Sequence, residues 1–302
     1  MTTATTQATA TAAPPTSRWA QLVGTSRPLS WVNTAYPFAA AYLLAGGGVD
    51  LTLVLGTLWL LVPYNLLMYG VNDVFDYESD VRNPRKGGVE GVVLDRRVHR
   101  LTLAAATATN LPFVVALVVL GDAVSTTVLA VSVAAVVAYS APVLRFKERP
   151  LLDSLTSSTH FVSPAVLGLA MTGHPLTGAA AAALGGFFLW GVGSHAFGAV
   201  QDIAADRAGG IASVATWLGA AATVRLAAAA YVVAGALLAT LPVPWWIASA
   251  LAIPYLLNVV PYLGLTDADC ERAHAGWRRF LWLNYLTGFL VTQLLIWATL
   301  GW

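Results

Sequence analysis

Charge and cysteine are both scarce in this sequence. Of its 302 residues, 10% are Asp, Glu, Lys or Arg, and Cys270 is the single cysteine. One cysteine excludes an intrachain disulfide and a thiol-based metal site such as a zinc finger. The sequence also lacks a P-loop, a GxGxxG stretch and the DxDxDG loop of an EF-hand, so no motif supports nucleotide or EF-hand calcium binding. We expect no nucleic-acid partner.

Hydrophobic residues make up 57% of the chain, and the mean hydropathy is +0.69. These values are typical of an integral membrane protein. A bilayer core of roughly 30 Å needs about 20 apolar residues per helix, and lipid offers the backbone no other hydrogen-bond partners. The sequence therefore predicts an all-α, polytopic membrane protein with nine transmembrane helices. They are expected over 28–47, 51–71, 101–120, 124–144, 152–172, 177–199, 212–241, 244–264 and 280–301.

The first residues have a different composition. The stretch MTTATTQATATAAPPTS has low complexity, with no basic start and no apolar run, so it resembles a disordered tail rather than a signal peptide. We expect a disordered N-terminal tail over 1–17 and a single transmembrane domain over 18–302.

The basic residues predict the orientation, because Lys and Arg are enriched in cytoplasmic loops. With nine helices, fifteen of the sixteen basic residues fall on one side, and Arg225 lies early in the seventh span. The loops of the opposite side (AGGGVD, LGDAVS, MTGHPLTG and LPVPW) contain none. The bias predicts a multi-pass protein of the cell membrane, with its N-terminus and its polar cap loops in the cytoplasm.

Acidic residues gather at two of the predicted cytoplasmic helix ends, in the stretches NDVFDYESD and AVQDIAADRAGG. Their spacing of three or four residues places them along one stripe of a continuing helix. The first acidic stripe consists of Asn72, Asp73, Asp76 and Asp80, and the second of Asp202 and Asp206.

Oxygen ligands suit hard cations, and Mg²⁺ is typically held by one or two carboxylates together with waters and substrate phosphates. Two stripes that face one another would hold two or more Mg²⁺ ions and a diphosphate between them. All six residues are therefore candidate metal ligands, and five are candidate catalytic residues: Asn72, Asp76, Asp80, Asp202 and Asp206. The alternative, that each stripe is a solvated helix end, is weakened by their placement on the same side.

Cationic donors would hold the diphosphate and stabilise it as a leaving group. The candidates are Arg82 and Lys86 behind the first stripe, and Tyr139, Arg145 and Lys147 at the end of the fourth span and after it. Singly, the basic residues among them also fit ordinary anchors of cytoplasmic loops. These residues alternate with the two acidic stripes on the same side of the membrane, which favours a role in binding the diphosphate.

Several polar residues lie within the predicted spans, among them Asn65, His160 and His195. Such residues are more often interhelical hydrogen-bonding groups than catalysts. Asn65 and His195 lie about two turns before the acidic stripes on their own helices. An allylic diphosphate held at the stripes would ionise to a carbocation, and this cation would need a dry pocket among the helices.

These stretches resemble a known family. NDVFDYESD matches the NDxxDxxxD signature and QDIAADRAG the DxxxD signature of the UbiA superfamily of intramembrane prenyltransferases, and YSAPVLRFKERP is similar to its Tyr/Lys-bearing loop. The resemblance implies a helical bundle with cytoplasmic cap loops that holds Mg²⁺ and an isoprenyl diphosphate. By position, the first metal site would be Asn72, Asp76 and Asp80, with Asp73 close by, and the second Asp202 and Asp206.

A narrower resemblance extends over SRPLSWVNTAYPFAAAYLL, PYNLLMYGVNDVFDYESDVRNPRKGGVEG and YSAPVLRFKERPLLDSLTSSTHF. They are similar to the lycopene elongases of actinobacteria, which make fifty-carbon carotenoids. That resemblance implies that dimethylallyl diphosphate ionises and that its allylic cation is attacked by a terminal double bond of lycopene. The resulting cation is quenched by proton loss or by water, at one or both ends of the acceptor. Any cyclisation of the product would need a separate carotenoid cyclase as partner.

Two other functions stay open at this point. Prenylation of an aromatic or quinone precursor, such as 4-hydroxybenzoate or dihydroxynaphthoate, needs the same Mg²⁺ site. The helices offer few charged residues outside the diphosphate end, which favours an all-hydrocarbon acceptor. A cation-coupled transporter would favour acids at the membrane midplane, whereas these acids cluster at helix ends.

Overall fold

The computed structural model describes residues 17–81 and 92–300, and within them it contains helices and no strand. The prediction of an all-α protein is confirmed. In chain order the elements are α1 (Arg18–Thr25), η1 (Pro28–Ser30), α2 (Trp31–Leu44), α3 (Leu51–Leu61), α4 (Pro63–Phe75), α5 (Tyr77–Asp80), η2 (Arg96–Val98), α6 (His99–Leu120), α7 (Ala123–Ser140), η3 (Phe146–Glu148), α8 (Leu152–Ala170), α9 (Gly178–Val200), α10 (Ile203–Gly209), α11 (Val214–Leu218), α12 (Ala220–Ala239), η4 (Trp245–Leu251), α13 (Ala252–Val259), η5 (Val260–Tyr262), η6 (Asp267–Arg272) and α14 (Ala273–Leu300).

Seven helical segments of the described part are long and apolar enough to cross a membrane. They are Leu51–Phe75, Arg96–Leu120, Ala123–Ser140, Gly178–Val200, Ala220–Ala239, Trp245–Tyr262 and Asp267–Thr299. The other two predicted spans correspond to α2, which has 14 residues, and α8, which has 19 residues and many hydroxyl side chains. The chain is a multi-pass membrane protein, and the count of nine crossings stays a prediction.

Several predicted helix boundaries are wrong, two of them for clear local reasons. The helix expected to reach residue 144 ends at Ser140, because Ala141 precedes Pro142 and takes an extended conformation with φ −60° and ψ 141°. The helix expected over 212–241 is two helices, because Gly219 has a φ of 79° and separates α11 from α12. Glycine takes this left-handed conformation without a steric cost.

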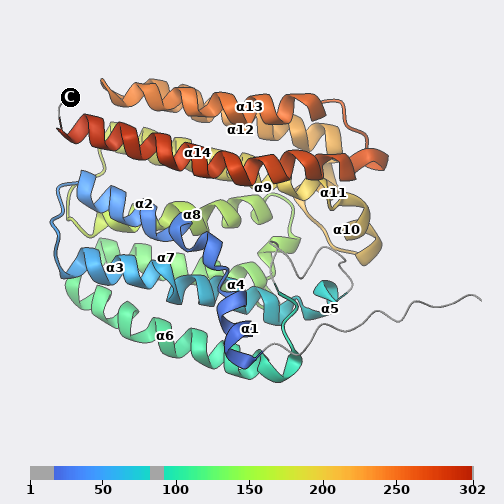
Figure 1. The fold of residues 1–302 in the computed structure, drawn as a ribbon, viewed down its shortest axis with the longest axis horizontal. Coiled ribbons are helices and arrows are strands. Elements are labelled where there is room, and N and C mark those ends of the chain that lie inside the picture. Colours follow the sequence, from blue (N-terminus) through green and yellow to red (C-terminus); the bar gives the residue numbers. More distant parts are fainter. Residues whose placement is uncertain (1–16, 82–91, 301–302) are drawn as a thin grey trace, which may run out of the picture.

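The helices form two halves with separate hydrophobic cores. The core of the first half contains Phe38, Trp59 and Tyr64 and is built by α2, α3, α4, α6, α7 and α8. The core of the second half contains Tyr231 and Tyr255 and is built mainly by α9, α12, α13 and α14. Figure 1 shows α12 to α14 on one side of the bundle, α3, α6 and α7 on the other, and α2 and α8 between them. The halves meet where α8 packs on α9.

The short polar elements gather at one end of the bundle. Figure 1 shows α1, α5, α10 and α11 at this end, whereas the C-terminal end of α14 lies at the other. Both acidic stripes belong to the first end, since one runs from α4 into α5 and the other begins just before α10. The two stripes thus lie at one end of the bundle, and the cytoplasmic orientation of this end stays a prediction.

The helix that leads to the first stripe is interrupted at Pro63, which separates α3 from α4. Proline has no N–H to continue the helical ladder. The side chain of Asn65 donates instead to the carbonyl oxygens of Leu60 at 2.8 Å and Leu61 at 3.2 Å, and Asn110 of α6 donates to the Pro63 carbonyl at 2.6 Å. Such side-chain donors make a proline break tolerable in lipid. Asn65 therefore has a structural role, as its residue type suggested.

Glycine permits a close contact between two helices of the first half. A Cβ on Gly168 of α8 would lie 2.4 Å from the Phe38 carbonyl oxygen and 3.0 Å from the Tyr42 amide nitrogen of α2. Both atoms belong to the backbone, so neither can rotate away. Small residues at such crossings allow membrane helices to approach closely.

We expect Gly168→Ala to destabilise the protein by about 1–3 kcal/mol, because the added methyl group forces α2 away from α8. The measurement is the thermal unfolding midpoint in detergent. Gly288→Ala is the matched control, since a Cβ there meets no atom within 4 Å. Equal midpoints for the two variants would contradict this account of the contact.

Candidate active site

The first acidic stripe keeps a helical spacing across a short break. Asp76 ends α4, but the amide of Asp76 donates to the Asn72 carbonyl and that of Asp80 to the Asp76 carbonyl, each at 2.9 Å. Asn72, Asp76 and Asp80 thus follow one another at successive helical turns. Asp73 and Asp80 are buried, so the carboxylates do not form a solvated helix end.

Asp73 is held by the segment that precedes α2. The Thr25 hydroxyl donates to Asp73 Oδ2, and Arg27 Nη2 lies 3.2 Å from Oδ1. The guanidinium of Arg27 also lies 4.1 Å from the ring centroid of Tyr69, a cation–π geometry. Arg27 is one of the basic residues expected on the cytoplasmic side, and its position before Pro28 in the sequence gives no signal of this contact.

Asp76 meets the basic loop that follows α7. The Lys147 ammonium forms an ion pair with Asp76 Oδ1, and Arg145 Nη2 lies 3.6 Å from the same oxygen. Arg145 also pairs with Glu148. Burial lowers the pKa of Lys147 to about 8, against the opposing effect of the Glu148 and Asp73 carboxylates. The structure therefore brings Arg145 and Lys147 to the first stripe, and their role as diphosphate ligands stays a prediction.

Backbone strain is concentrated beside these acids. The non-glycine residues with positive φ in the described part are Arg27 at 52°, Val143 at 77°, Arg145 at 38° and Leu151 at 72°. Two of them, Arg27 and Arg145, extend a guanidinium to the first stripe. Strained conformations of this kind persist where the surroundings fix them, and they cluster at functional sites.

Tyr139 has a different surrounding from the one expected. Its hydroxyl lies 3.1 Å from His195 Nε2, and His195 Nδ1 lies 3.1 Å from the hydroxyl of Ser154. The next residue, Ser140, donates to Asn72 Oδ1 at 3.0 Å. Tyr139 is therefore near the first stripe, but the partner of its hydroxyl is a histidine of α9.

A buried carboxylate near this group escaped sequence analysis. Asp153 at the start of α8 accepts from the Ser154 amide and from the Val214 amide of α11, each at 2.7 Å. It thereby joins the first half to the segment that follows the second stripe. The sequence around Asp153 gives no signal of this role, because a single Asp followed by hydroxyl residues does not form a motif with a recognisable spacing.

The second stripe begins where α9 gives way to α10. Asp202 precedes α10, and the Asp206 amide donates to the Asp202 carbonyl at 2.8 Å. Figure 1 shows α10 and α5 at the same end of the bundle. The predicted diphosphate ligands Arg82 and Lys86 lie outside the described residues.

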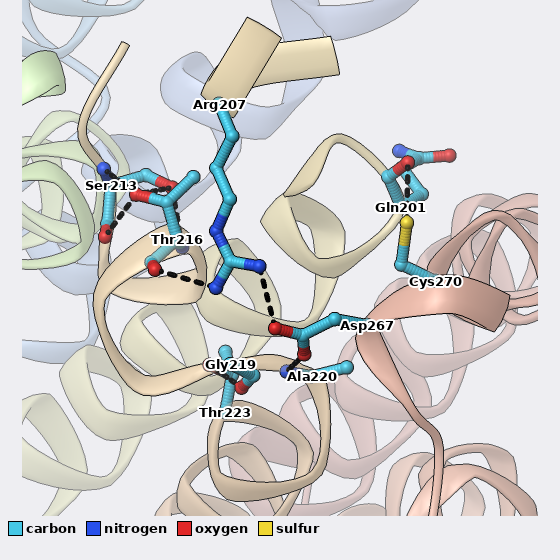
Figure 2. A network of polar contacts seen from close by, with 9 residues as sticks. All are labelled: Gln201, Arg207, Ser213, Thr216, Gly219, Ala220, Thr223, Asp267 and Cys270. Carbon is cyan, nitrogen blue, oxygen red and sulfur yellow. Dashed lines mark hydrogen bonds and ion pairs between the residues drawn. The ribbon is translucent and has the colours of Figure 1, made fainter. Parts of the chain in front are cut away.

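A polar clamp holds the segment of the second stripe, and Figure 2 shows its members. Arg207 Nη1 lies 2.7 Å from Asp267 Oδ2, and Arg207 Nη2 donates to the Thr216 carbonyl at 3.0 Å. The other oxygen of Asp267 accepts from the Ala220 amide at 2.6 Å. Four segments, α10, α11, the start of α12 and η6, are thereby tied together next to Asp206.

The donor chemistry of the stripes suits Mg²⁺, because all candidate ligands offer oxygen atoms. In the described residues no group of three or more His, Cys, Asp or Glu side chains is arranged as a metal site. The carboxylates of Asp73 and Asp76 instead contact Arg27, Arg145 and Lys147. The assignment of the six stripe residues as metal ligands stays a prediction.

The chain is a helical membrane bundle with acids and bases gathered at one end, and comparison with known sequences identifies it as an intramembrane enzyme of a known family. Residues 34–298 match the UbiA prenyltransferase family. The chain is 58% identical over 282 residues to a C(50) beta-cyclic carotenoids biosynthesis protein, LbtBC, of Dietzia sp. (strain CQ4), covering 93% of this chain and 65% of that protein. It is 52% identical over 271 residues to a lycopene elongase/hydratase of Corynebacterium glutamicum, covering 90% and 94%. The chain therefore belongs to the UbiA prenyltransferase family.

Solved structures agree on the fold. A UbiA homolog from Archaeoglobus fulgidus bound to DMAPP and Mg²⁺ superposes with a TM-score of 0.65 at 17% sequence identity, covering 88% of this chain and 98% of that one. At this identity the likeness shows the helical architecture. The family resemblance inferred from the motifs is confirmed.

We expect Asp267→Ala to loosen α10, because the carboxylate joins Arg207 to the Ala220 amide. Removing an exposed ion pair and one backbone hydrogen bond costs about 1 kcal/mol, so amide exchange should be about fivefold faster. The measurement is hydrogen–deuterium exchange of peptides that cover 203–220.

Asp269→Ala is the control for this experiment, since Asp269 lies in the same short helix and accepts from the Thr266 hydroxyl. Unchanged exchange of α10 in Asp267→Ala would show that the clamp does not hold the second stripe.

Proposed function

We propose that the protein catalyses Mg²⁺-dependent prenyl transfer from dimethylallyl diphosphate to the ends of lycopene, giving fifty-carbon carotenoids through an allylic carbocation. The observation that carries the proposal is the meeting of the first acidic stripe with Arg145 and Lys147 at one end of an apolar bundle. Carboxylates and cations at one site suit a metal-bound diphosphate, which needs both kinds of partner.

The two stripes would share the donor. Mg²⁺ would be held by Asn72, Asp73, Asp76, Asp80, Asp202 and Asp206. When bound, it would neutralise the diphosphate and favour its departure. Lys147 and Arg145 would then contact the diphosphate oxygens in place of Asp76, and Arg82 and Lys86 are further candidates. The interior would hold the cation away from water.

An apolar acceptor suits the interior of the bundle. The side-chain amide nitrogens of the buried residues Asn65 and Asn110 donate to the helix backbone around Pro63, so these two donors are not available to the polar head group of an aromatic acceptor. The names of the Dietzia and Corynebacterium relatives also support a carotenoid. Prenylation of a quinone precursor remains the alternative, because it would use the same donor site.

We also propose an orientation in the membrane and a partner. The distribution of Lys and Arg supports a cytoplasmic N-terminus and cytoplasmic cap loops. A carotenoid cyclase would act on the product as a separate partner. The chain spans 65% of the length of the Dietzia relative, so that protein contains a further part to which this chain does not correspond.

Membranes that contain the protein should convert lycopene, dimethylallyl diphosphate and Mg²⁺ into products heavier by one and then two isoprenyl units. The measurement is liquid chromatography with mass spectrometry of extracted carotenoids. Membranes without the protein are the control. Unchanged lycopene together with prenylated 4-hydroxybenzoate or dihydroxynaphthoate would replace this proposal with the aromatic alternative.

Asp76→Ala and Asp202→Ala should each lower turnover by at least about a hundredfold, because each removes a proposed metal ligand from its own stripe. Both variants should accumulate in the membrane and elute as folded protein. Glu78→Gln is the matched control, since Glu78 lies on α5 but pairs with Arg96 away from the stripe, and its activity should stay near that of the wild type. Near-normal turnover in either Asp variant would remove that stripe from the site.

A further inference from the structure

Three helices of the two halves meet in one hydrogen-bonded group. Tyr139 lies in the last turn of α7, His195 lies on α9 and Ser154 lies in the first turn of α8. The imidazole bridges the other two, with 3.1 Å from Nε2 to the phenol oxygen and 3.1 Å from Nδ1 to the serine hydroxyl. Both ring nitrogens are thus engaged. In the tautomer with the proton on Nδ1, the ring donates to Ser154 and accepts from Tyr139.

The group lies between the acidic end and the interior. On one side, Ser140 follows Tyr139 and donates to Asn72 of the first stripe. On the other, the edge of His160 meets the Tyr139 ring with 5.1 Å between the ring centroids and an interplanar angle of 83°. His160 is buried in α8. The phenol is therefore adjacent to the place where the donor would ionise and the acceptor would react.

The proposed reaction must dispose of one proton for each prenyl group. The C–O bond of the donor breaks, and its electron pair leaves with the diphosphate. A π-electron pair of the acceptor forms the new C–C bond and leaves a cation on the acceptor. Either a neighbouring C–H bond breaks and its electron pair forms a double bond, or water adds and loses a proton. Both routes release one proton inside an apolar bundle, where few groups can receive it.

We propose that Tyr139 takes this proton on its phenol oxygen as its own hydroxyl proton passes to His195 Nε2. This proposal rests on the proposed prenyl transfer and adds a residue role to it. Tyr139 is the catalytic residue of the step, and His195 and Ser154 act through it. Ser154 holds the imidazole through Nδ1, and it lies in the first turn of α8, beside Asp153. Tyr139 and His195 would receive the proton in both routes, whether it comes from a C–H bond of the acceptor cation or from the added water.

Two other roles for Tyr139 make different kinetic predictions. A ligand of the diphosphate would raise the KM for the donor when it is removed. A purely structural phenol would lower the amount of folded enzyme without changing the products of the folded fraction. Loss of the proton acceptor instead separates ionisation of the donor from formation of the product, because the donor cation still forms and is then captured by water.

The experiment compares Tyr139→Phe and His195→Gln with wild-type protein in detergent or membranes. Released diphosphate, prenylated product and dimethylallyl alcohol are counted together. Wild type should release one diphosphate per prenyl group transferred. Both variants should form product about a hundredfold more slowly, and the ratio of diphosphate to product should rise at least fivefold, with dimethylallyl alcohol as the balance. The KM for the donor should stay within twofold.

Tyr231→Phe is the matched control. Tyr231 is buried, and its hydroxyl lies 3.1 Å from that of Ser194, the neighbour of His195 on α9. This substitution removes a similar hydrogen bond from α9 in the second half, and it should leave the diphosphate-to-product ratio at one. If Tyr139→Phe does not accumulate as folded protein, His195→Gln decides the question, because glutamine keeps hydrogen-bonding groups but cannot carry the proton.

A ratio near one in both variants, or a raised KM for the donor as the main change, would overturn the proton-transfer role. Failure of the proposed function would be distinct, since wild type itself would then leave lycopene unchanged. The same variants would in that case be tested with whichever acceptor wild type prenylates at carbon, because that transfer also releases one proton.

Discussion

Carboxylates at the rim of an apolar bundle must be neutralised, and the polar end of this protein is arranged around that constraint. Asp73 and Asp76 are held by cations from two different segments, Arg27 before α2 and the basic loop after α7. An isolated buried carboxylate would be costly, and removing one partner of a buried pair leaves an uncompensated charge. The contacts that balance the first stripe therefore also fix the loops that cover it.

In the proposed function, the same charges would prepare this end of the bundle for an anionic ligand. A diphosphate with its bound metal ions carries negative and positive charges. A site that already contains carboxylates and cations could exchange its own ion pairs, such as Asp76 with Lys147, for ion pairs with this ligand. The left-handed backbone at Arg27 and Arg145 shows that the guanidinium positions are imposed by the surrounding fold. Such placement lowers the reorganisation that binding requires.

The sequence was sufficient for features that depend on composition and spacing. The apolar runs predicted the helices, and the i, i+4 spacing of Asn72, Asp76 and Asp80 predicted a stripe that persists across the break at Asp76. Arg145 and Lys147 were predicted as diphosphate ligands, and the structure places both beside Asp76 of the first stripe. What sequence analysis missed depends on contacts between distant segments. Nothing local distinguishes Arg27 or Asp153, and only the packing of α8 on α9 brings Ser154 to His195.

The break at Pro63 has a consequence for where the first stripe is fixed in space. Asn110 of α6 and the side chain of Asn65 anchor the start of α4 about two turns before Asn72. Because α4 begins anew at this point, its direction is set by side-chain contacts deep in the lipid-embedded part and does not simply continue that of α3. The direction of the helix that presents the acids is thus set in the interior of the bundle, at a distance from the ion pairs that hold the loops around Arg27 and Arg145.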